Sequence, residues 1–192
     1  MGKLVISENI TLDGVIADPT GEAGTRFGGW FNQIGDRDRD AWAKVELAEA
    51  MGAEALLMGR RSDEYFAPRW ASRTGEWADR LNSLPKYVVS ATIDEAKWTN
   101  STVLKGDVVT EVSKLKQEIS GEIVVNASGQ LVPTLLEHDL ADELRLIIYP
   151  FVVGAGPRPF GEISDTKAMR LVRAQTIGDT LVYLTYQRAA DA

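Results

Sequence analysis

The sequence predicts an α/β domain in three layers, with a mainly parallel central sheet that ends in an antiparallel hairpin. Short apolar runs rich in Val and Ile alternate with segments of helical periodicity along most of the chain. The last part instead contains two strand-like runs joined by a tight turn. Because one domain ordinarily holds roughly 100–200 residues, we expect residues 1–192 to fold as a single unit.

Five apolar runs are predicted to form the parallel part of the sheet, since strands buried on both faces are rich in aliphatic residues. They span residues 3–7, 55–58, 87–90, 122–126 and 144–149. Two further runs, residues 169–177 and 180–188, meet at Gly178-Asp179 and are predicted to form the hairpin.

Helical spacing is found between these strands. Apolar residues recur three or four positions apart, so that each segment presents one apolar face to the sheet. The residues concerned are Trp42, Val45 and Ala48 in the first segment, Val112, Leu115 and Ile119 in the second, and Leu131 and Leu135 in the third.

Residues 18–39 are rich in Gly, Asp and Arg and have little periodicity, which predicts a long surface loop. Loops of this length often cover a functional site. The sequence leaves open whether this loop covers a substrate or packs without a binding role. Trp30 is its candidate for contact with a substrate, whereas the other tryptophans are expected to pack in or beside the core.

The composition is that of a globular protein, with 44% hydrophobic and 26% charged residues. The 21 basic and 28 acidic side chains give a formal net charge of −7, which repels the phosphates of nucleic acid and of anionic lipid. Neither a signal peptide nor a run of about 18 apolar residues is apparent. We therefore expect a cytoplasmic protein without a nucleic-acid or membrane partner.

The chain has no cysteine, and His138 is its single histidine. Disulfides, thiolate nucleophiles and cysteine-ligated metals are therefore excluded, and a lone histidine is a poor basis for a transition-metal site. We predict no metal. His138 stands near the end of a predicted helix, where a cation interacts favourably with the helix dipole.

A strand, a glycine and a helix start follow one another at residues 55–65. Gly59 ends the strand, and Arg60, Arg61 and Ser62 open the helix. Free N–H groups at a helix start favour an anion, and arginines with a hydroxyl group suit a phosphate. The alternative is a solvated helix start, at which the arginines pair with the two acidic residues that follow.

Two more strand ends carry small or hydroxyl-bearing residues. Ala127, Ser128 and Gly129 would let a ligand approach the backbone before another helix begins, and Ser90 and Thr92 follow a third strand. Ligands of open α/β sheets bind at the carboxyl ends of the strands. Together, the three ends indicate a phosphate-rich ligand such as a dinucleotide.

Four segments, in this order, resemble the dihydrofolate reductase-like superfamily. They are SENITLDGVIA at residues 7–17, LMGRRS at 57–62, ASGQL at 127–131 and DELRLIIYP at 142–150. They resemble in particular the branch that includes the reductase domain of bacterial riboflavin biosynthesis. The resemblance covers residues 3 to 188 and implies the three-layer fold of the superfamily, an NADPH cofactor and a homodimer.

The resemblance also implies a role for individual residues. Asp13 would contact the substrate near the nicotinamide. Asp13 or an ordered water is also the candidate general acid, because no other side chain is an obvious proton donor; a turn-forming aspartate is the alternative. The implied cofactor-binding residues are Gly14 and Ile16 in the same loop; Gly59, Arg60, Arg61 and Ser62 with Ser90, Ala91 and Thr92 around the 2′-phosphate; and Ala127, Ser128, Gly129, Gln130 and Leu131 at the pyrophosphate.

The implied activity is NADPH-dependent hydride transfer to a small heterocycle, as in 5-amino-6-(5-phosphoribosylamino)uracil reductase. One alternative is dihydrofolate reductase, which requires a buried carboxylate on the first helix. That position falls near Ala43, and the flanking Asp40 and Glu46 are expected to project elsewhere, which disfavours dihydrofolate. The other alternative is a non-catalytic nucleotide-binding protein of the same fold.

Overall fold

Strands and helices alternate along the chain in the computed structural model, which describes residues 1–189. The helices are α1 (Asp36–Gly52), α2 (Arg60–Ala71), α3 (Glu76–Ser83), α4 (Val108–Glu118) and α5 (Val132–Glu137), with a short 3₁₀ helix, η1 (Trp30–Gln33). The strands are β1 (Lys3–Thr11), β2 (Ala53–Gly59), β3 (Lys86–Val89), β4 (Ser101–Leu104), β5 (Glu122–Asn126), β6 (Glu143–Tyr149), β7 (Met169–Ile177) and β8 (Leu181–Arg188).

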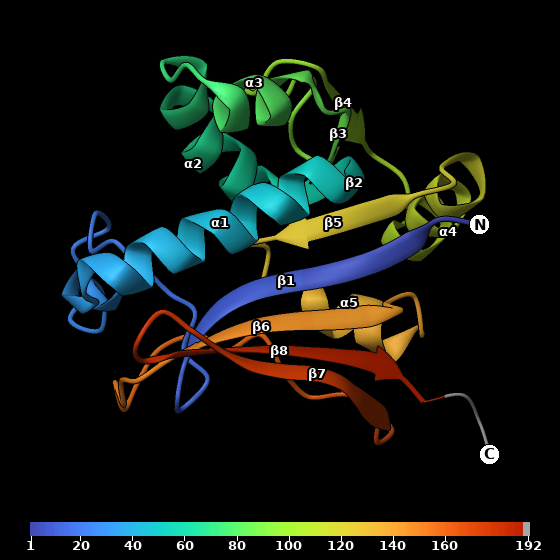
Figure 1. The fold of residues 1–192 in the computed structure, drawn as a ribbon. Coiled ribbons are helices and arrows are strands. Elements are labelled where there is room, and N and C mark those ends of the chain that lie inside the picture. Colours follow the sequence, from blue (N-terminus) through green and yellow to red (C-terminus); the bar gives the residue numbers. More distant parts are fainter. Residues whose placement is uncertain (190–192) are drawn as a thin grey trace.

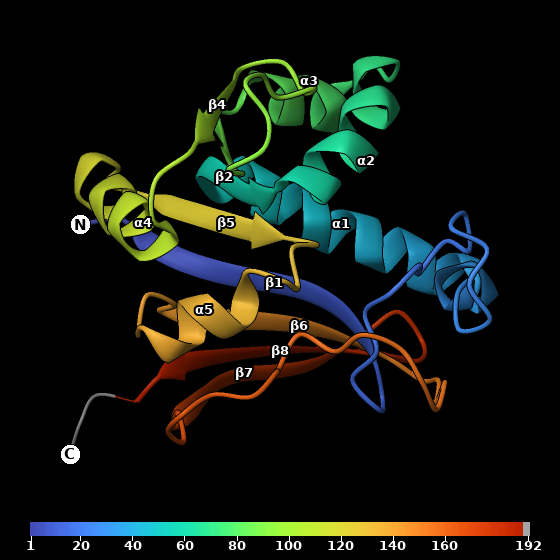
Figure 2. The same cartoon turned by 180° about the vertical axis from the view of Figure 1, so that it is seen from behind.

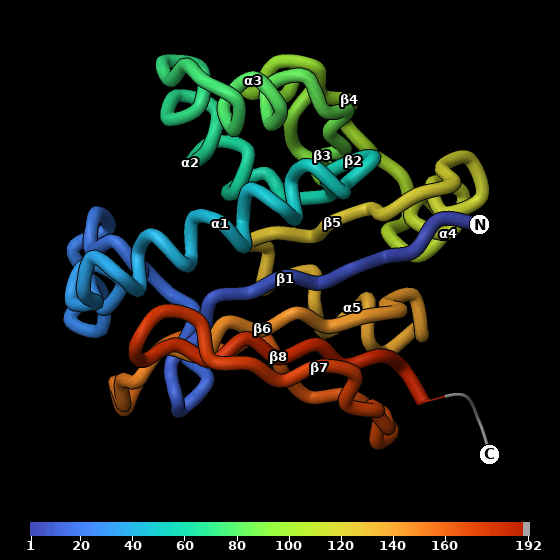
Figure 3. Tube along the Cα trace, in the orientation of Figure 1, coloured from blue at the N-terminus to red at the C-terminus, as the bar shows by residue number. Residues whose placement is uncertain are grey.

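All these strands belong to one eight-stranded sheet in the order β4-β3-β2-β5-β1-β6-β8-β7. Every pairing from β4 to β6 is parallel, and β8 pairs antiparallel with both β6 and β7. The trace in Figure 3 shows β1 running through the middle of the sheet between β5 and β6. The mainly parallel sheet with a C-terminal antiparallel hairpin is therefore confirmed.

Helices cover both faces of the sheet, which makes the three predicted layers (Figures 1 and 2). Leu4 and Ile6 of β1 pack toward α4 and α5, whereas Val5 between them packs toward α1, α2 and α3. Successive side chains of a strand point to opposite faces. Even-numbered side chains of β1 therefore face the α5 layer, and odd-numbered ones face α1.

The predicted 18–39 loop is shorter than expected, because α1 already begins at Asp36. Asp36 and Asp38 lie in its first turn, where acidic residues favour the helix dipole. Asp38 also accepts hydrogen bonds from the backbone N–H groups of Asp179 and Thr180, at 2.6 and 3.0 Å. These contacts join the start of α1 to the β7–β8 turn.

The prediction of the apolar face of α1 is wrong in part. Ala48 is exposed, and the buried positions of the helix are Asp38, Glu46 and Ala50. Polar residues thus occupy much of the face that α1 turns toward the sheet. This hides the helical periodicity of apolar residues from which a buried face is recognised.

Among the described residues, no helix combines the length and apolar character needed to cross a membrane.

The tryptophans expected to pack do so. Trp42, Trp77 and Trp70 form a chain of ring contacts, with centroids 5.6 and 5.0 Å apart. Trp98 is buried beside Phe66, at 5.9 Å between ring centroids. Aromatic pairs in such tilted arrangements add to the free energy of burial, so this group holds α1, α2 and α3 together.

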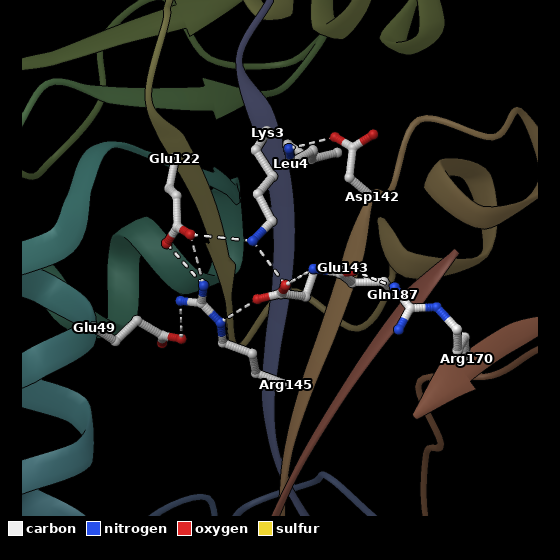
Figure 4. A network of polar contacts seen from close by, with 9 residues as sticks. All are labelled: Lys3, Leu4, Glu49, Glu122, Asp142, Glu143, Arg145, Arg170 and Gln187. Atoms are coloured by element: carbon white, nitrogen blue, oxygen red, sulfur yellow. Dashed lines mark hydrogen bonds and ion pairs between the residues drawn. The ribbon is translucent and has the colours of Figure 1, made fainter. Parts of the chain in front are cut away.

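An ion-pair network crosses the central strands beneath α1 (Figure 4). Arg145 of β6 contacts Glu143 at 2.7 Å, Glu122 of β5 at 2.7 Å and Glu49 of α1 at 3.1 Å. Lys3 of β1 contacts the same Glu143 and Glu122, at 2.7 and 3.3 Å. The network therefore joins three adjacent strands to the helix that covers them.

Replacing Arg145 by alanine should destabilise the fold strongly, because the side chains of Glu49 and Glu143 are nearly buried and would lose the cation that compensates their charge. Removing one partner of a buried ion pair typically costs about 3–5 kcal/mol. We expect urea denaturation of R145A to show a loss of that size in the free energy of unfolding. The control K114A removes an exposed pair with Glu118 and should change stability little. Equal effects of the two variants would contradict this account.

Candidate functional site

The carboxyl ends of β2, β5 and β1 lie side by side at one edge of the sheet. The last residue pair between β5 and β1 is Asn126 with Ser7, but β1 continues to Thr11. After Asn126 the chain leaves the sheet through Ala127, whose φ of 49° is left-handed. The end of β1 therefore extends past β5, next to the predicted ligand-binding turn at residues 127–129.

Ser62 and Ser128 join the turns after β2 and β5. Their hydroxyl oxygens are 3.0 Å apart. Ser62 donates to the carbonyl of Ala127 at 2.6 Å, and Ser128 accepts from the N–H of Gly59 at 3.2 Å. Both serines are buried. Their hydroxyl groups thus fix the two predicted phosphate-binding turns against each other.

The start of α2 has features of both predicted alternatives, a phosphate-binding helix start and a solvated one. No side chain caps this helix, so its first backbone N–H groups are available to an anion. Arg60 pairs with Glu64 at 2.8 Å, as the solvated alternative predicts. Arg61 is exposed and forms no ion pair within residues 1–189. Arg61 is therefore the arginine that remains available to a phosphate.

The loop after β1 closes onto the turn after β5. A Cβ atom at Gly129 would meet Cδ1 of Ile16, so the side chain of Ile16 lies directly against this glycine. Gly14 has a φ of 82°, another conformation that side chains rarely adopt. In the turn after β5, the N–H of Leu131 donates to the carbonyl of Ser128 at 2.7 Å, and Gln130 is exposed.

Ser90, Ala91 and Thr92 follow β3, which neighbours β2, and so they continue the same sheet edge. The hydroxyl oxygens of Ser90 and Thr92 are 3.2 Å apart, and the N–H of Thr92 donates to Ser90. Ala91 and Thr92 are exposed. The three predicted strand ends are thus arranged in a row.

Asp13 binds the protein's own backbone. It accepts hydrogen bonds from the Thr11 hydroxyl at 2.7 Å and from the N–H groups of Val153 and Gly154 at 3.1 and 2.8 Å. The bond from Thr11 and the two N–H groups lower the pKa of Asp13 to about 2. A carboxyl group with this pKa is ionised near neutral pH and holds no proton to donate. The geometry favours the turn-forming alternative, and a catalytic role stays a prediction.

Trp30 lies in the core and is only 1% exposed. Its ring meets that of Tyr149 edge-on at 4.8 Å, and its Nε1 donates to the carbonyl of Ala17 at 3.2 Å. These contacts anchor the long loop to the sheet. The position gives no support to the expected substrate contact, because the indole lies behind the surface of the loop.

Sequence reasoning missed a buried polar cluster between α1 and the sheet. The Asn9 amide donates to Glu46 at 3.2 Å, and its oxygen accepts from Trp42 Nε1 and the Tyr149 hydroxyl, both at 3.0 Å. Burial raises the pKa of Glu46. The expectation that Glu46 projects away from the position of Ala43 is wrong. Residues three apart share a helix face, and that spacing was the available signal.

Glu8, on the opposite face of β1, was also missed. It is 4% exposed, and its Oε1 has no hydrogen-bond partner in the described chain. Burial raises the pKa of Glu8 to about 8, against the opposing effect of a hydrogen bond from the Ser128 N–H. A signal was present here too, because Glu8 interrupts the inward-facing series of Ile6 and Ile10.

The strand order, the closing hairpin and the helix starts at the carboxyl ends of β2 and β5 define a dihydrofolate reductase-like fold. The chain aligns with dihydrofolate reductase from Enterococcus faecalis complexed with NADP(H) and RAB-propyl, with a TM-score of 0.58, 15% identity and coverage of 98% of this chain and 97% of the other. More particularly, the chain belongs to the family of the RibD C-terminal domain, whose model matches residues 2–183.

Two further solved structures have a similar fold. A candidate riboflavin biosynthesis protein from Shewanella sp. PV-4 gives a TM-score of 0.72 at 21% identity, covering 98% of this chain and 99% of the other. A diaminohydroxyphosphoribosylaminopyrimidine deaminase/5-amino-6-(5-phosphoribosylamino)uracil reductase from Thermotoga maritima gives 0.63 at 16% identity, covering 98% of this chain and 57% of the other. The family indicates a reductase-type function.

Substitution of Glu46 by glutamine should change how stability depends on pH. Burial raises the pKa of Glu46 from its ordinary value to about 8. Between these two pKa values the native state binds more protons than the unfolded chain, so stability falls as pH rises from one to the other. E46Q keeps the size and an acceptor oxygen but does not titrate. From about pH 5 to 8, wild type should lose stability relative to E46Q by up to roughly 1.4 kcal/mol per pH unit.

Urea denaturation across this pH range measures the effect. The control E118Q changes an exposed residue of α4, and its stability should follow that of wild type at every pH. Parallel curves for wild type and E46Q would show that Glu46 does not titrate in this window.

Proposed function

We propose that the protein is an NADPH-dependent reductase that transfers a hydride to a C=N or C=O carbon of a small heterocycle. The observation that carries this proposal is the row of strand ends, in which the turns after β2 and β5 are joined through Ser62 and Ser128. The family membership supports the reductase class. The activity named for the Thermotoga maritima relative supports 5-amino-6-(5-phosphoribosylamino)uracil, or a close analogue, as the substrate.

The residues at this edge suit a dinucleotide. The uncapped start of α2 and the side chain of Arg61 would hold the 2′-phosphate, because backbone N–H groups and guanidinium both bind phosphate oxygens. The left-handed turn at Ala127, with Gly129 beyond it, would hold the pyrophosphate. Gly14 and Ile16 would lie at the nicotinamide. The bound nicotinamide supplies the hydride, and the protein supplies position and electrostatics.

Glu46 favours dihydrofolate as a second candidate substrate. Its carboxyl group lies on the first helix, is buried and hydrogen-bonds to Asn9 near the end of β1. This is the kind of group that the dihydrofolate alternative requires. Two assays distinguish the candidates, one with 5-amino-6-(5-phosphoribosylamino)uracil and one with dihydrofolate. Each measures the oxidation of NADPH by the decrease of its absorbance in the near ultraviolet. NADPH binding without turnover of either would favour the non-catalytic alternative.

The choice of NADPH over NADH should depend mainly on Arg61. A charge-assisted contact with the 2′-phosphate contributes roughly 1.5–3 kcal/mol, or about 10- to 150-fold in affinity. Fluorescence titration should show that R61A loses most of the preference for NADPH. R60A is the matched comparison and should lose less, because Arg60 already pairs with Glu64. Equal affinity of the native protein for NADPH and NADH would refute the cofactor assignment.

Asp13→Asn tests the predicted catalytic role of Asp13. The amide replaces one of the oxygens that accept from the loop of Val153 and Gly154, so the geometry of the proposed substrate contact changes. We expect a lower kcat with nearly unchanged NADPH affinity, as when a transition-state contact is lost. Full turnover by D13N would remove Asp13 from the mechanism.

A further inference from the structure

Glu8 differs from the other buried acids of the described chain. Asp38 and Asp63 each accept backbone N–H hydrogen bonds, Glu46 accepts from an amide, and Glu143 contacts two cations. Only Glu8 has a buried carboxyl oxygen, Oε1, without a partner among residues 1–189. Leaving such a group unpaired costs free energy, and unpaired buried polar atoms are rare in folded proteins.

Glu8 lies next to one of the turns of the candidate site. The residue lies just beyond Ser7, the last residue of β1 that pairs with β5. Its carboxyl group meets the N–H of Ser128, in the turn that ends β5. Glu8 is thus positioned between the end of β1 and the proposed pyrophosphate turn.

The surroundings of Glu8 favour a neutral partner. The charged group that acts on it most strongly is another acid, Glu46, across the strand on the α1 side. The cations Lys3 and Arg145 are already bound by other carboxylates. A phosphate or carboxylate of a ligand would therefore find neither of these cations free, whereas a neutral hydrogen-bonding group needs none.

We propose that Glu8 binds the amide edge of a ligand in the candidate site, an inference that rests on the proposed reductase function. The acid form of a carboxyl group presents an O–H donor beside a C=O acceptor. This pattern is complementary to the N–H and C=O of an amide. Two sources offer that edge in the proposed reaction, namely the carboxamide of the nicotinamide and the ring amide of a uracil-type substrate.

The variant E8L tests the proposal in two ways. In the free protein it removes an unpaired polar group, so thermal denaturation should show unchanged or higher stability than wild type. In ligand titrations it should weaken binding of the amide-bearing ligand by about 10-fold or more. E8Q keeps a donor and an acceptor and should retain most of the affinity. E118L, an exposed acid replaced in the same way, should change neither quantity.

Three probes distinguish the sources: NADPH, adenosine 2′,5′-bisphosphate, which lacks the nicotinamide, and 5-amino-6-(5-phosphoribosylamino)uracil added to the NADP⁺-saturated protein. Weaker binding of NADPH by E8L, with unchanged binding of the bisphosphate, supports the nicotinamide carboxamide. Unchanged NADPH binding with weaker binding of the uracil compound supports the substrate amide.

Two results would overturn the proposal for Glu8 while leaving the proposed function intact. The first is unchanged affinity of E8L for both NADPH and the uracil compound. The second is a clear loss of stability of free E8L, since Glu8 would then already have a partner in the free protein. The proposed function fails separately if wild type binds neither NADPH nor the bisphosphate.

Discussion

The guanidinium group of Arg145 lies among carboxylates from α1, β5 and β6, and this contact holds the helix against the centre of the sheet (Figure 4). The charges form an interdependent set, because each buried carboxylate is desolvated and needs the cation. The anchor on α1 is Glu49. Glu46 lies three residues earlier on the same helix face, so the network also sets where Glu46 meets Asn9.

The alternation of side chains along β1 then distributes the polar groups of the site. Asn9 points toward α1 and supports Glu46, whereas Glu8 points toward the other layer and meets the turn after β5. Burial raises the pKa of both Glu8 and Glu46. Glu8 belongs to β1, and Glu46 of α1 contacts the same strand through Asn9. The proposed site thus combines carboxyl groups of raised pKa with backbone donors and Arg61. This suits a ligand with a phosphate-bearing part and a neutral heterocyclic part.

Several residues predicted to bind a ligand also hold segments of the candidate site together. The hydroxyls of Ser62 and Ser128 hold two turns together, and Asp13 ties the loop after β1 to the segment after β6. Their contribution is preorganisation, since turns already held in place lose less entropy when a ligand binds. The reductase family accounts for the fold and reaction class, while the buried acids distinguish the individual site.

Local patterns in the sequence determined the strands at 122–126 and 169–177, the hairpin and the glycine turns at the strand ends, because each depends on neighbouring residues alone. The alternation of strands and helices predicted the parallel pairing that brings these ends to one edge, whereas the strand order came from the tertiary structure. Tertiary structure alone decided the burial of Glu46 and Trp30. Burial depends on which distant element covers a side chain, and in α1 polar residues occupy the covered face, so periodicity could not reveal it.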